Sequence, residues 1–182
     1  MDSLFAPWRM QWVNRERPDD EDDSGCPFCA LVEQGDDRAS NIVARSEYTF
    51  VLLNNMPYNP GHVMVLPYAH TGEFHTLDGR VLVDCMKTTQ LVVTALNESL
   101  SPGGFNVGFN IGAAGGASIT DHLHLHIIPR WESDTSFLPL TANTAVVEEA
   151  VDETYERLSD ALLETAQVSA AEGNDSVRID HG

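Results

Sequence analysis

Apolar and polar residues alternate in several stretches of this chain with the two-residue period that is typical of strands. The segment NIVARSEYTFVLLN at 41–54 contains two such runs separated by RSE, which predicts a β-hairpin. The segments VMVLP at 63–67, FNVGFNIG at 105–112 and HLHLHII at 122–128 predict three further strands. The pattern therefore predicts five strands.

Two longer segments follow the helical period instead, with apolar residues recurring at spacings of three and four. Residues 79–100 predict an amphipathic helix that ends at SPGG, and residues 145–166 predict a second one. The predicted apolar stripe of the first helix comprises Leu82, Met86, Thr89, Val93 and Leu96. That of the second comprises Val147, Val151, Thr154, Leu158 and Leu162.

The order of these elements predicts an α+β domain, built on a mostly antiparallel five-stranded sheet with two main helices. We assign the domain to residues 25–167. Residues 1–24 form a predicted N-terminal arm, in which Phe5, Trp8 and Trp12 precede the acidic run DDEDD. Residues 168–182 are poor in large apolar side chains, which predicts a disordered acidic tail.

The net charge of the chain excludes some classes of binding partner. The chain has 28 acidic and 10 basic residues, for a net charge of -18, and Lys87 is its one lysine. Such a surface repels phosphate backbones, so we expect no nucleic-acid duplex as a partner. An acidic, lysine-poor surface resembles proteins of salt-rich cytoplasms and suggests a halophilic archaeon; an ordinary acidic bacterial protein is the alternative.

No membrane partner is expected either, because no stretch is long and apolar enough to span a bilayer. The first residues also lack the order of a signal peptide, so we predict a cytoplasmic protein. In a reducing compartment, the pair Cys26 and Cys29 in CPFC indicates metal or redox chemistry rather than a structural disulfide.

Three histidines occupy alternate positions in HLHLHII. On a strand, His122, His124 and His126 project from one face, whereas the intervening leucines face the core. Close imidazoles suppress one another's protonation, which favours a neutral, nucleophilic nitrogen that can attack phosphorus. The alternatives are a row of buried structural histidines or three ligands of one metal.

A loop of small residues, AAGGAS, precedes this strand. Gly112, Gly115 and Gly116 let backbone N–H groups turn toward an anion, and the Ser118 hydroxyl can donate a further hydrogen bond. Loops of small residues are common in proteins simply because tight turns favour glycine. Beside three histidines, this one predicts a phosphate-binding loop.

The segment HLHLHII resembles the His-φ-His-φ-His-φ-φ signature of the histidine triad family, whose members are nucleotide hydrolases and transferases. The likeness extends to LNNMPYNPGHVMVLP and GFNVGFNIGAAGGAS, and covers residues 26–131. The segments PWRMQWV, YNPGH and IPRW are most similar to the diadenosine tetraphosphate phosphorylase-like branch. The resemblance implies the histidine triad fold, a nucleotide substrate, and a homodimer in which two sheets join into one.

The resemblance also implies roles for individual residues. His124 resembles the nucleophile that attacks the α-phosphate, and His126 resembles the residue that holds phosphate oxygens or the neighbouring network. Asn54 stands where the family binds ribose hydroxyls, and Asn110 where an amide contacts the phosphate or the nucleophile's surroundings. Ser118 stands where many members carry glutamine, a departure that affects the leaving-group step. With Gly112 and Gly116, these positions form the predicted nucleotide site.

A second predicted site binds metal. The two-residue spacing of Cys26 and Cys29 allows both thiolates to bind one tetrahedral zinc. His70 and His122 match positions that complete a zinc site in cysteine-bearing members of the family, so the resemblance implies a closed structural zinc. The alternative is a reduced cysteine pair without metal; no thioredoxin pattern surrounds it.

These features predict an enzyme that acts on dinucleoside polyphosphates at the α-phosphate through a nucleotidyl intermediate on His124. The attacking group in the second step, water or inorganic phosphate, stays open. Two alternatives are a purine nucleoside phosphoramidase and a nucleotide-binding regulatory module without turnover.

Overall fold

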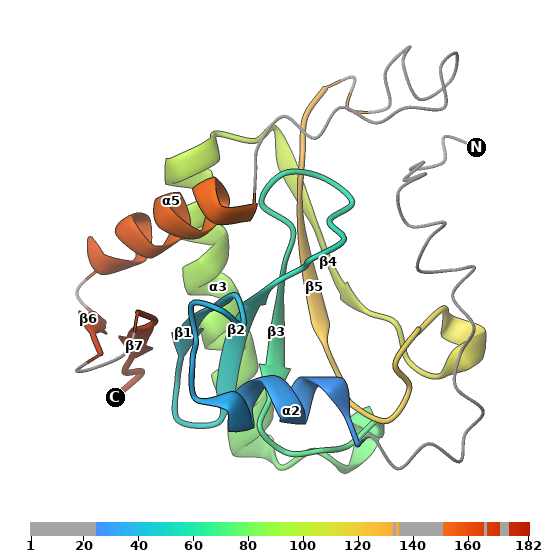
Figure 1. The fold of residues 1–182 in the computed structure, drawn as a ribbon. Coiled ribbons are helices and arrows are strands. Elements are labelled where there is room, and N and C mark those ends of the chain that lie inside the picture. The colour runs from blue at the N-terminus through green and yellow to red at the C-terminus, as the bar shows by residue number, and fades with distance from the viewer. Residues whose placement is uncertain (1–24, 133, 135–150, 166, 172–174) are drawn as a thin grey trace.

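Seven strands pair into one mixed sheet in the computed structural model, which describes residues 25–132, 134, 151–165, 167–171 and 175–182. The sheet order is β4-β5-β3-β2-β1-β7-β6 (Figure 1). Neighbouring strands are antiparallel except for the parallel pair β1 and β7. The strands are β1 Ile42–Arg45, β2 Thr49–Leu53, β3 Val63–Pro67, β4 Gly104–Phe109, β5 Leu125–Arg130, β6 Val168–Ala170 and β7 Val177–Ile179.

Side chains alternate between two cores on opposite faces of the sheet, as the period of two requires. Val51 and Leu53 of β2 face a core shared with helices α3 Gly79–Leu100 and α5 Val151–Leu163. Phe50 and Leu52 face a smaller core under helix α2 Pro27–Gln34. In Figure 1, α2 lies in front of the sheet. The α+β class is confirmed, and the functional face of the sheet is the one beneath α2.

Helix α3 has the predicted bounds, but part of its predicted stripe was wrong. Thr89 and Leu96 are buried as expected, whereas Met86 is 55% exposed. The buried row includes the polar residues Asp84 and Thr88. These bury because they find hydrogen-bond partners. Apolar periodicity alone therefore could not identify this face of the helix.

The prediction of five strands and a disordered tail was wrong. Residues 168–170 and 177–179 form β6 and β7, and β7 extends the sheet beside β1. Val177 and Ile179 are buried in the helix-side core, and the Ser176 hydroxyl donates to the buried carboxylate of Asp37. This segment is ordered because β7 pairs with β1 and Ser176 hydrogen-bonds to Asp37. The polar composition of the segment gives no sign of these partners. A third α-helix, α2, was also not predicted.

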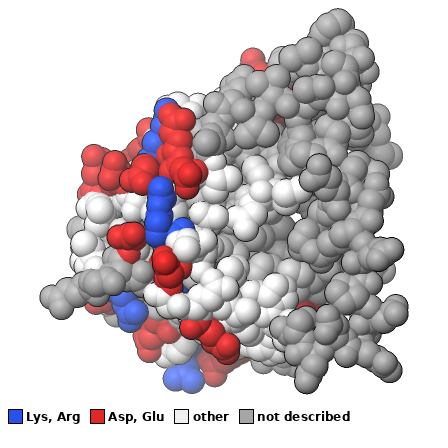
Figure 2. Space-filling model, in the orientation of Figure 1, with Lys and Arg blue, Asp and Glu red and all other residues white. Residues whose placement is uncertain are grey.

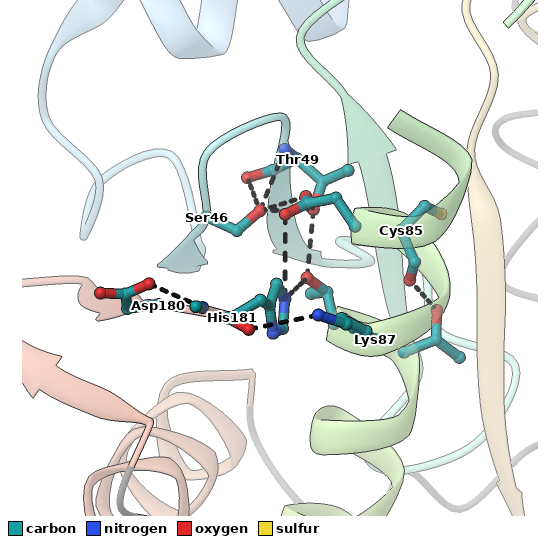
Figure 3. Close-up of polar contacts among 10 residues, drawn as sticks. Ser46, Thr49, Cys85, Lys87, Asp180 and His181 are labelled. Carbon is teal, nitrogen blue, oxygen red and sulfur yellow. Dashed lines mark hydrogen bonds and ion pairs between the residues drawn. The ribbon is translucent and has the colours of Figure 1, made fainter. Parts of the chain in front are cut away.

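A buried polar cluster joins the last residues to α3 and the β1–β2 hairpin (Figure 3). Ser46 and Thr49 donate to the Asp84 carboxylate over 2.5 and 2.9 Å. The His181 ring, at its Nε2 atom, lies 2.8 Å from the Thr88 hydroxyl and 3.9 Å from Asp84. The His181 side chain is only 11% exposed.

This environment makes the stability of the protein sensitive to acid. Burial lowers the pKa of His181 below 6.5, with Lys87 acting in the same direction and the carboxylates of Asp84 and Asp180 opposing it. The unfolded chain therefore binds a proton at higher pH than the folded protein does, so this contribution to stability is lost as the pH falls through about 6.5. We expect His181→Gln to reduce the difference in unfolding free energy between about pH 7.5 and about pH 5.

Urea unfolding at the two pH values measures this difference. His75→Gln is the matched control, because the His75 side chain is 77% exposed. An unchanged pH dependence in His181→Gln would contradict the prediction.

Two predicted features lie outside the described residues: the arm at 1–24, with Phe5, Trp8 and Trp12, and the start of the second helix at Val147. In the described part of that helix, Thr154, Leu158 and Leu162 are buried as predicted. None of the helices in the described residues combines the length and apolar character that crossing a membrane requires.

Candidate functional site

The three alternating histidines lie at the start of β5, beneath α2. His126 is within the strand and pairs with Met64 of β3, whereas His122 and His124 directly precede it. The intervening leucines are buried as predicted, but His122 and His124 are also buried, at 1% and 4% exposure. Phe28 of α2 packs against both rings, which explains why only His126 remains partly accessible.

Backbone carbonyl groups determine which ring nitrogen of two histidines carries the proton. The His124 Nδ1 atom lies 2.9 Å from the His122 carbonyl oxygen, which can only accept, so Nδ1 carries the proton and donates. In the neutral ring, the lone pair is then on Nε2. Burial, the main cause, lowers the pKa of His124 below its usual 6.5, and so favours the neutral ring. The result is an imidazole with a nucleophilic Nε2.

His126 is held by a second histidine. The Tyr58 backbone N–H donates to His62 Nδ1 over 3.1 Å, so neutral His62 carries its proton on Nε2. That atom lies 3.0 Å from His126 Nδ1, which accepts. Neutral His126 therefore has its proton on Nε2, as a donor. The ring centroids of His124 and His126 are 4.9 Å apart, so a ring with its lone pair on Nε2 and a ring with an Nε2–H donor are neighbours.

A second group of side chains gathers around the cysteine knuckle, residues 26–29. Possible ligand atoms of Cys26, Cys29, His70 and His122 all lie within 4.8 Å of one another. His122 Nδ1 is 3.3 Å from the Cys26 sulfur and 3.6 Å from that of Cys29. His70 Nδ1 is 3.4 Å from the Cys29 sulfur. All four residues of the predicted metal site are thus brought together.

The chemistry of these donors fits zinc. Two thiols and two imidazoles form one of the common tetrahedral zinc sets. His122 donates from Nε2 to the Pro67 carbonyl over 2.8 Å, which leaves the lone pair on Nδ1, the atom that faces the sulfurs. Burial, followed by the hydrogen bond and charge of Cys26, raises the pKa of Cys29 to about 11. In the absence of a cation Cys29 is therefore kept as a thiol, and a metal would displace its proton.

Asn54 lies at the end of β2 on the functional face. Its backbone N–H donates to the His62 carbonyl, and its side-chain oxygen accepts from the Met56 N–H over 2.9 Å. The amide nitrogen is 4.0 Å from the sulfur of Met64, which pairs with His126. Asn54 is thus connected to both the His62 turn and the strand beside the triad.

The turn before His62 requires glycine at Gly61. Its φ is +74°, and an added Cβ would lie 2.5 Å from the Leu100 side chain and 3.0 Å from that of Pro129. The turn thereby packs closely and fixes the backbone from which His62 reaches His126.

The predicted phosphate loop runs between β4 and the triad. Gly112 and Gly116 have positive φ values, and the Ala117 N–H donates to the Gly112 carbonyl over 3.2 Å. Asn110 and Ser118 flank this turn and are partly buried. Among the described residues, no hydrogen bond links the side chains of Asn110 or Ser118 to the three histidines. Their predicted roles in binding phosphate stay predictions.

Sequence reasoning missed three contributors to the site: the Pro67 carbonyl, the Tyr58 N–H and the Phe28 ring. Backbone groups carry no sequence signal, so the first two could not have been identified. Phe28 did have a sequence signal, because it lies between Cys26 and Cys29, the two cysteines predicted to bind metal.

Charged side chains are unevenly distributed over the surface of the described residues in Figure 2. In Figure 2, the described acidic and basic residues gather toward the left and lower edges, whereas the central surface shows uncharged residues. The acidic residues of the described part of the chain therefore do not crowd this central surface. An anionic ligand would meet less repulsion there than the net charge suggests.

Comparisons with known proteins agree with this geometry. The model of the HIT domain family matches residues 36–133. A curated protein, AP-4-A phosphorylase from Mycobacterium tuberculosis (strain ATCC 25618 / H37Rv), is 31% identical over 160 residues, which cover 86% of this chain and 82% of that protein.

Two solved structures are similar in fold. A Zn-bound histidine triad family protein from Mycobacterium smegmatis has a TM-score of 0.64 and 26% identity, covering 77% of this chain and 94% of that one. A hypothetical histidine triad nucleotide-binding protein from Sulfolobus tokodaii has a TM-score of 0.65 and 24% identity, covering 82% of this chain and 99% of that one.

Proposed function

The chain belongs to the histidine triad (HIT) family and is an enzyme that acts on nucleotides, and we propose that its substrates are dinucleoside polyphosphates such as diadenosine tetraphosphate. One observation carries the proposal: the hydrogen bond from His124 Nδ1 to the His122 carbonyl leaves the lone pair on Nε2. The similarity to AP-4-A phosphorylase supports the choice of substrate class.

In the proposed first step, His124 Nε2 attacks the α-phosphorus. A P–N bond forms while the P–O bond to the β-phosphate breaks, so diadenosine tetraphosphate releases ATP. The ring becomes an adenylyl-imidazolium whose Nδ1–H remains bonded to the His122 carbonyl, which stabilises the new positive charge. The Nε2–H of His126, fixed by His62, is a donor for a phosphate oxygen.

In the second step, water or inorganic phosphate attacks the adenylyl group and the P–N bond breaks. Water yields AMP and inorganic phosphate yields ADP, and neutral His124 is restored in both cases. We propose that the backbone of the loop at Gly112 and Gly116 holds phosphate oxygens and that Asn54 binds ribose. We further propose that Asn110 contacts the phosphate or the surroundings of the nucleophile, and that Ser118 acts in the leaving-group step. These roles follow from the family resemblance and from the location of the residues around the triad.

Product analysis tests this function and distinguishes its two forms. The enzyme is incubated with diadenosine tetraphosphate at low and high salt, with and without inorganic phosphate, and the nucleotides are separated by chromatography. ATP with AMP indicates hydrolysis, whereas ATP with phosphate-dependent ADP indicates phosphorolysis. Absence of cleavage, together with cleavage of an adenosine phosphoramidate, would replace the proposal with the phosphoramidase alternative.

We also propose that Cys26, Cys29, His70 and His122 bind one structural zinc ion. The fit of this donor set supports the proposal, as does the zinc in the similar protein from Mycobacterium smegmatis. Bound zinc would link the knuckle, the segment after β3 and the start of the catalytic strand. Since His122 is two residues before His124, the site would stabilise the backbone carbonyl that holds the nucleophile.

We expect the purified protein to contain one zinc per chain, and Cys26→Ser/Cys29→Ser to contain almost none, because removal of two thiolates leaves too few ligands. Elemental analysis by mass spectrometry measures the content. The matched control is Cys85→Ala, which removes the remaining cysteine, buried in α3. Equal zinc in the double variant and the wild type would refute the assignment.

We propose a homodimer that forms along β4, an edge strand of the sheet that the described residues build. The order of the sheet places β4 at one edge. Val107 of β4 is 46% exposed, and Val83 and Met86 of α3 are more than half exposed. The exposed Val107 on this edge strand favours strand pairing with a second copy, and the exposed apolar residues of α3 would allow helices of the two copies to pair. A monomeric mass in sedimentation equilibrium would contradict this proposal.

A further inference from the structure

Phe28 contacts two of the three triad histidines, although it lies almost 100 positions before them in the sequence. The centroid of its ring is 5.3 Å from that of His124, with 51° between the planes. It is 5.5 Å from the ring centroid of His122, in an edge-to-face arrangement of 78°. One aromatic side chain thus touches both the proposed nucleophile and a proposed metal ligand.

The knuckle fixes where Phe28 lies. Cys26 is the residue that precedes α2, Pro27 is the first residue of the helix, and the Ala30 N–H donates to the Cys26 carbonyl over 3.1 Å. Phe28 is 7% exposed and belongs to the core beneath α2, with Phe50, Leu52 and Met64 among its members. Its ring therefore has little freedom to move away from the histidines.

The other contacts of His124 leave one direction of motion open. The hydrogen bond from Nδ1 fixes one end of the imidazole, and His126 meets the ring edge-on at 79°. A single hydrogen bond still permits the ring to tilt about it, and such a tilt displaces Nε2, the attacking atom. The Phe28 ring, which packs against His124 in a tilted arrangement, opposes this motion.

We propose that Phe28 is a positioning residue that holds the His124 ring in the orientation for attack on phosphorus. The proposal rests on the proposed function of His124 as the nucleophile. Phe28 acts through His124 and supplies no proton or hydrogen bond. Phe28 lies between Cys26 and Cys29, so a well-ordered knuckle fixes the position of its ring. The ring in turn fixes the orientation of His124.

Kinetics of three variants test the proposal. In Phe28→Leu we expect kcat for diadenosine tetraphosphate to fall by about tenfold to hundredfold while KM stays within about twofold, because misplacement of a reacting atom affects the chemical step. Phe28→Tyr retains a flat ring and is expected to restore most of kcat. Phe50→Leu is the matched control: Phe50 lies in the same core but stacks on Tyr68. It is expected to lose stability and keep kcat.

A spectrum of the imidazole nitrogens provides a readout that does not depend on turnover. In long-range proton–nitrogen correlation spectra, we expect Phe28→Leu to shift and broaden the His124 signals, while Phe50→Leu leaves them unchanged. Zinc content is measured for every variant, so that loss of the knuckle is not mistaken for loss of the ring contact.

Different results overturn the two proposals. If the wild type cleaves no diadenosine tetraphosphate, the proposed function fails, and the spectra alone decide whether Phe28 positions the His124 ring. If the wild type reacts and Phe28→Leu retains both kcat and the His124 signals, the positioning role is wrong. A rise in KM that depends on the base, without a change in kcat, would assign Phe28 to substrate contact instead.

Discussion

Replacing His124 with alanine is expected to lower turnover of diadenosine tetraphosphate by at least about 10³-fold, because it removes the only atom proposed to form a bond with the α-phosphorus. The wild type should gain the mass of one adenylyl group after brief mixing with substrate at high salt, and the variant should gain none. Intact-protein mass spectrometry makes this comparison.

His75→Ala is the control for this experiment, since His75 is an exposed histidine that pairs with Glu73 outside the site. It should form the adduct like the wild type. Adduct formation by His124→Ala would show that another residue is the nucleophile. Nucleotide binding without turnover in the wild type itself would favour the regulatory alternative.

Replacing Asp37 with alanine is expected to destabilise the protein by about 3–5 kcal/mol, the usual cost of removing one partner of a buried ion pair. The Asp37 carboxylate is fully buried and accepts from Arg45 Nε and Nη2 over 2.8 and 2.6 Å. The same carboxylate accepts from Ser176, next to β7. Arginine keeps its charge in proteins, so in the variant Arg45 would remain charged without its carboxylate partner.

Urea unfolding measures the change in free energy. The matched control is Glu153→Ala, which breaks the exposed pair with Arg157 and should cost less than about 0.5 kcal/mol. A loss below about 1 kcal/mol in Asp37→Ala would show that the network contributes less than burial of an ion pair implies.

The central strands and the site ligands could be predicted because their signals are local. Alternation identified strands β1 to β5, and the strict spacing of the histidines in HLHLHII identified the triad. The four residues predicted to bind metal do lie together in the structure. That group could be predicted only because the family resemblance added His70 and His122 to a cysteine pair whose spacing is itself informative.

The features of the fold and the site that could not be predicted depend on contacts between segments that are distant in the sequence. The order of the tail depends on β1 and Asp37, and the burial of Thr88 and Asp84 depends on partners in the hairpin. The burial of His122 and His124 depends on α2, a helix whose first residues carry a cysteine pair rather than a helical pattern. No periodic pattern of apolar residues in the sequence predicts these contacts. Their contribution to stability can be recognised only in the folded structure.

The parallel pairing of β1 with β7 has a consequence for biosynthesis. Ala44 of β1 pairs with Val177 of β7. This edge of β1 therefore stays unpaired until nearly all of the described chain has left the ribosome. During that interval the apolar run Ile42, Val43 and Ala44 presents unpaired backbone groups to other nascent chains. Long-range closure is also slow compared with formation of α3. We therefore expect chaperones to be needed most by chains that are synthesised through β5 but not yet through β7.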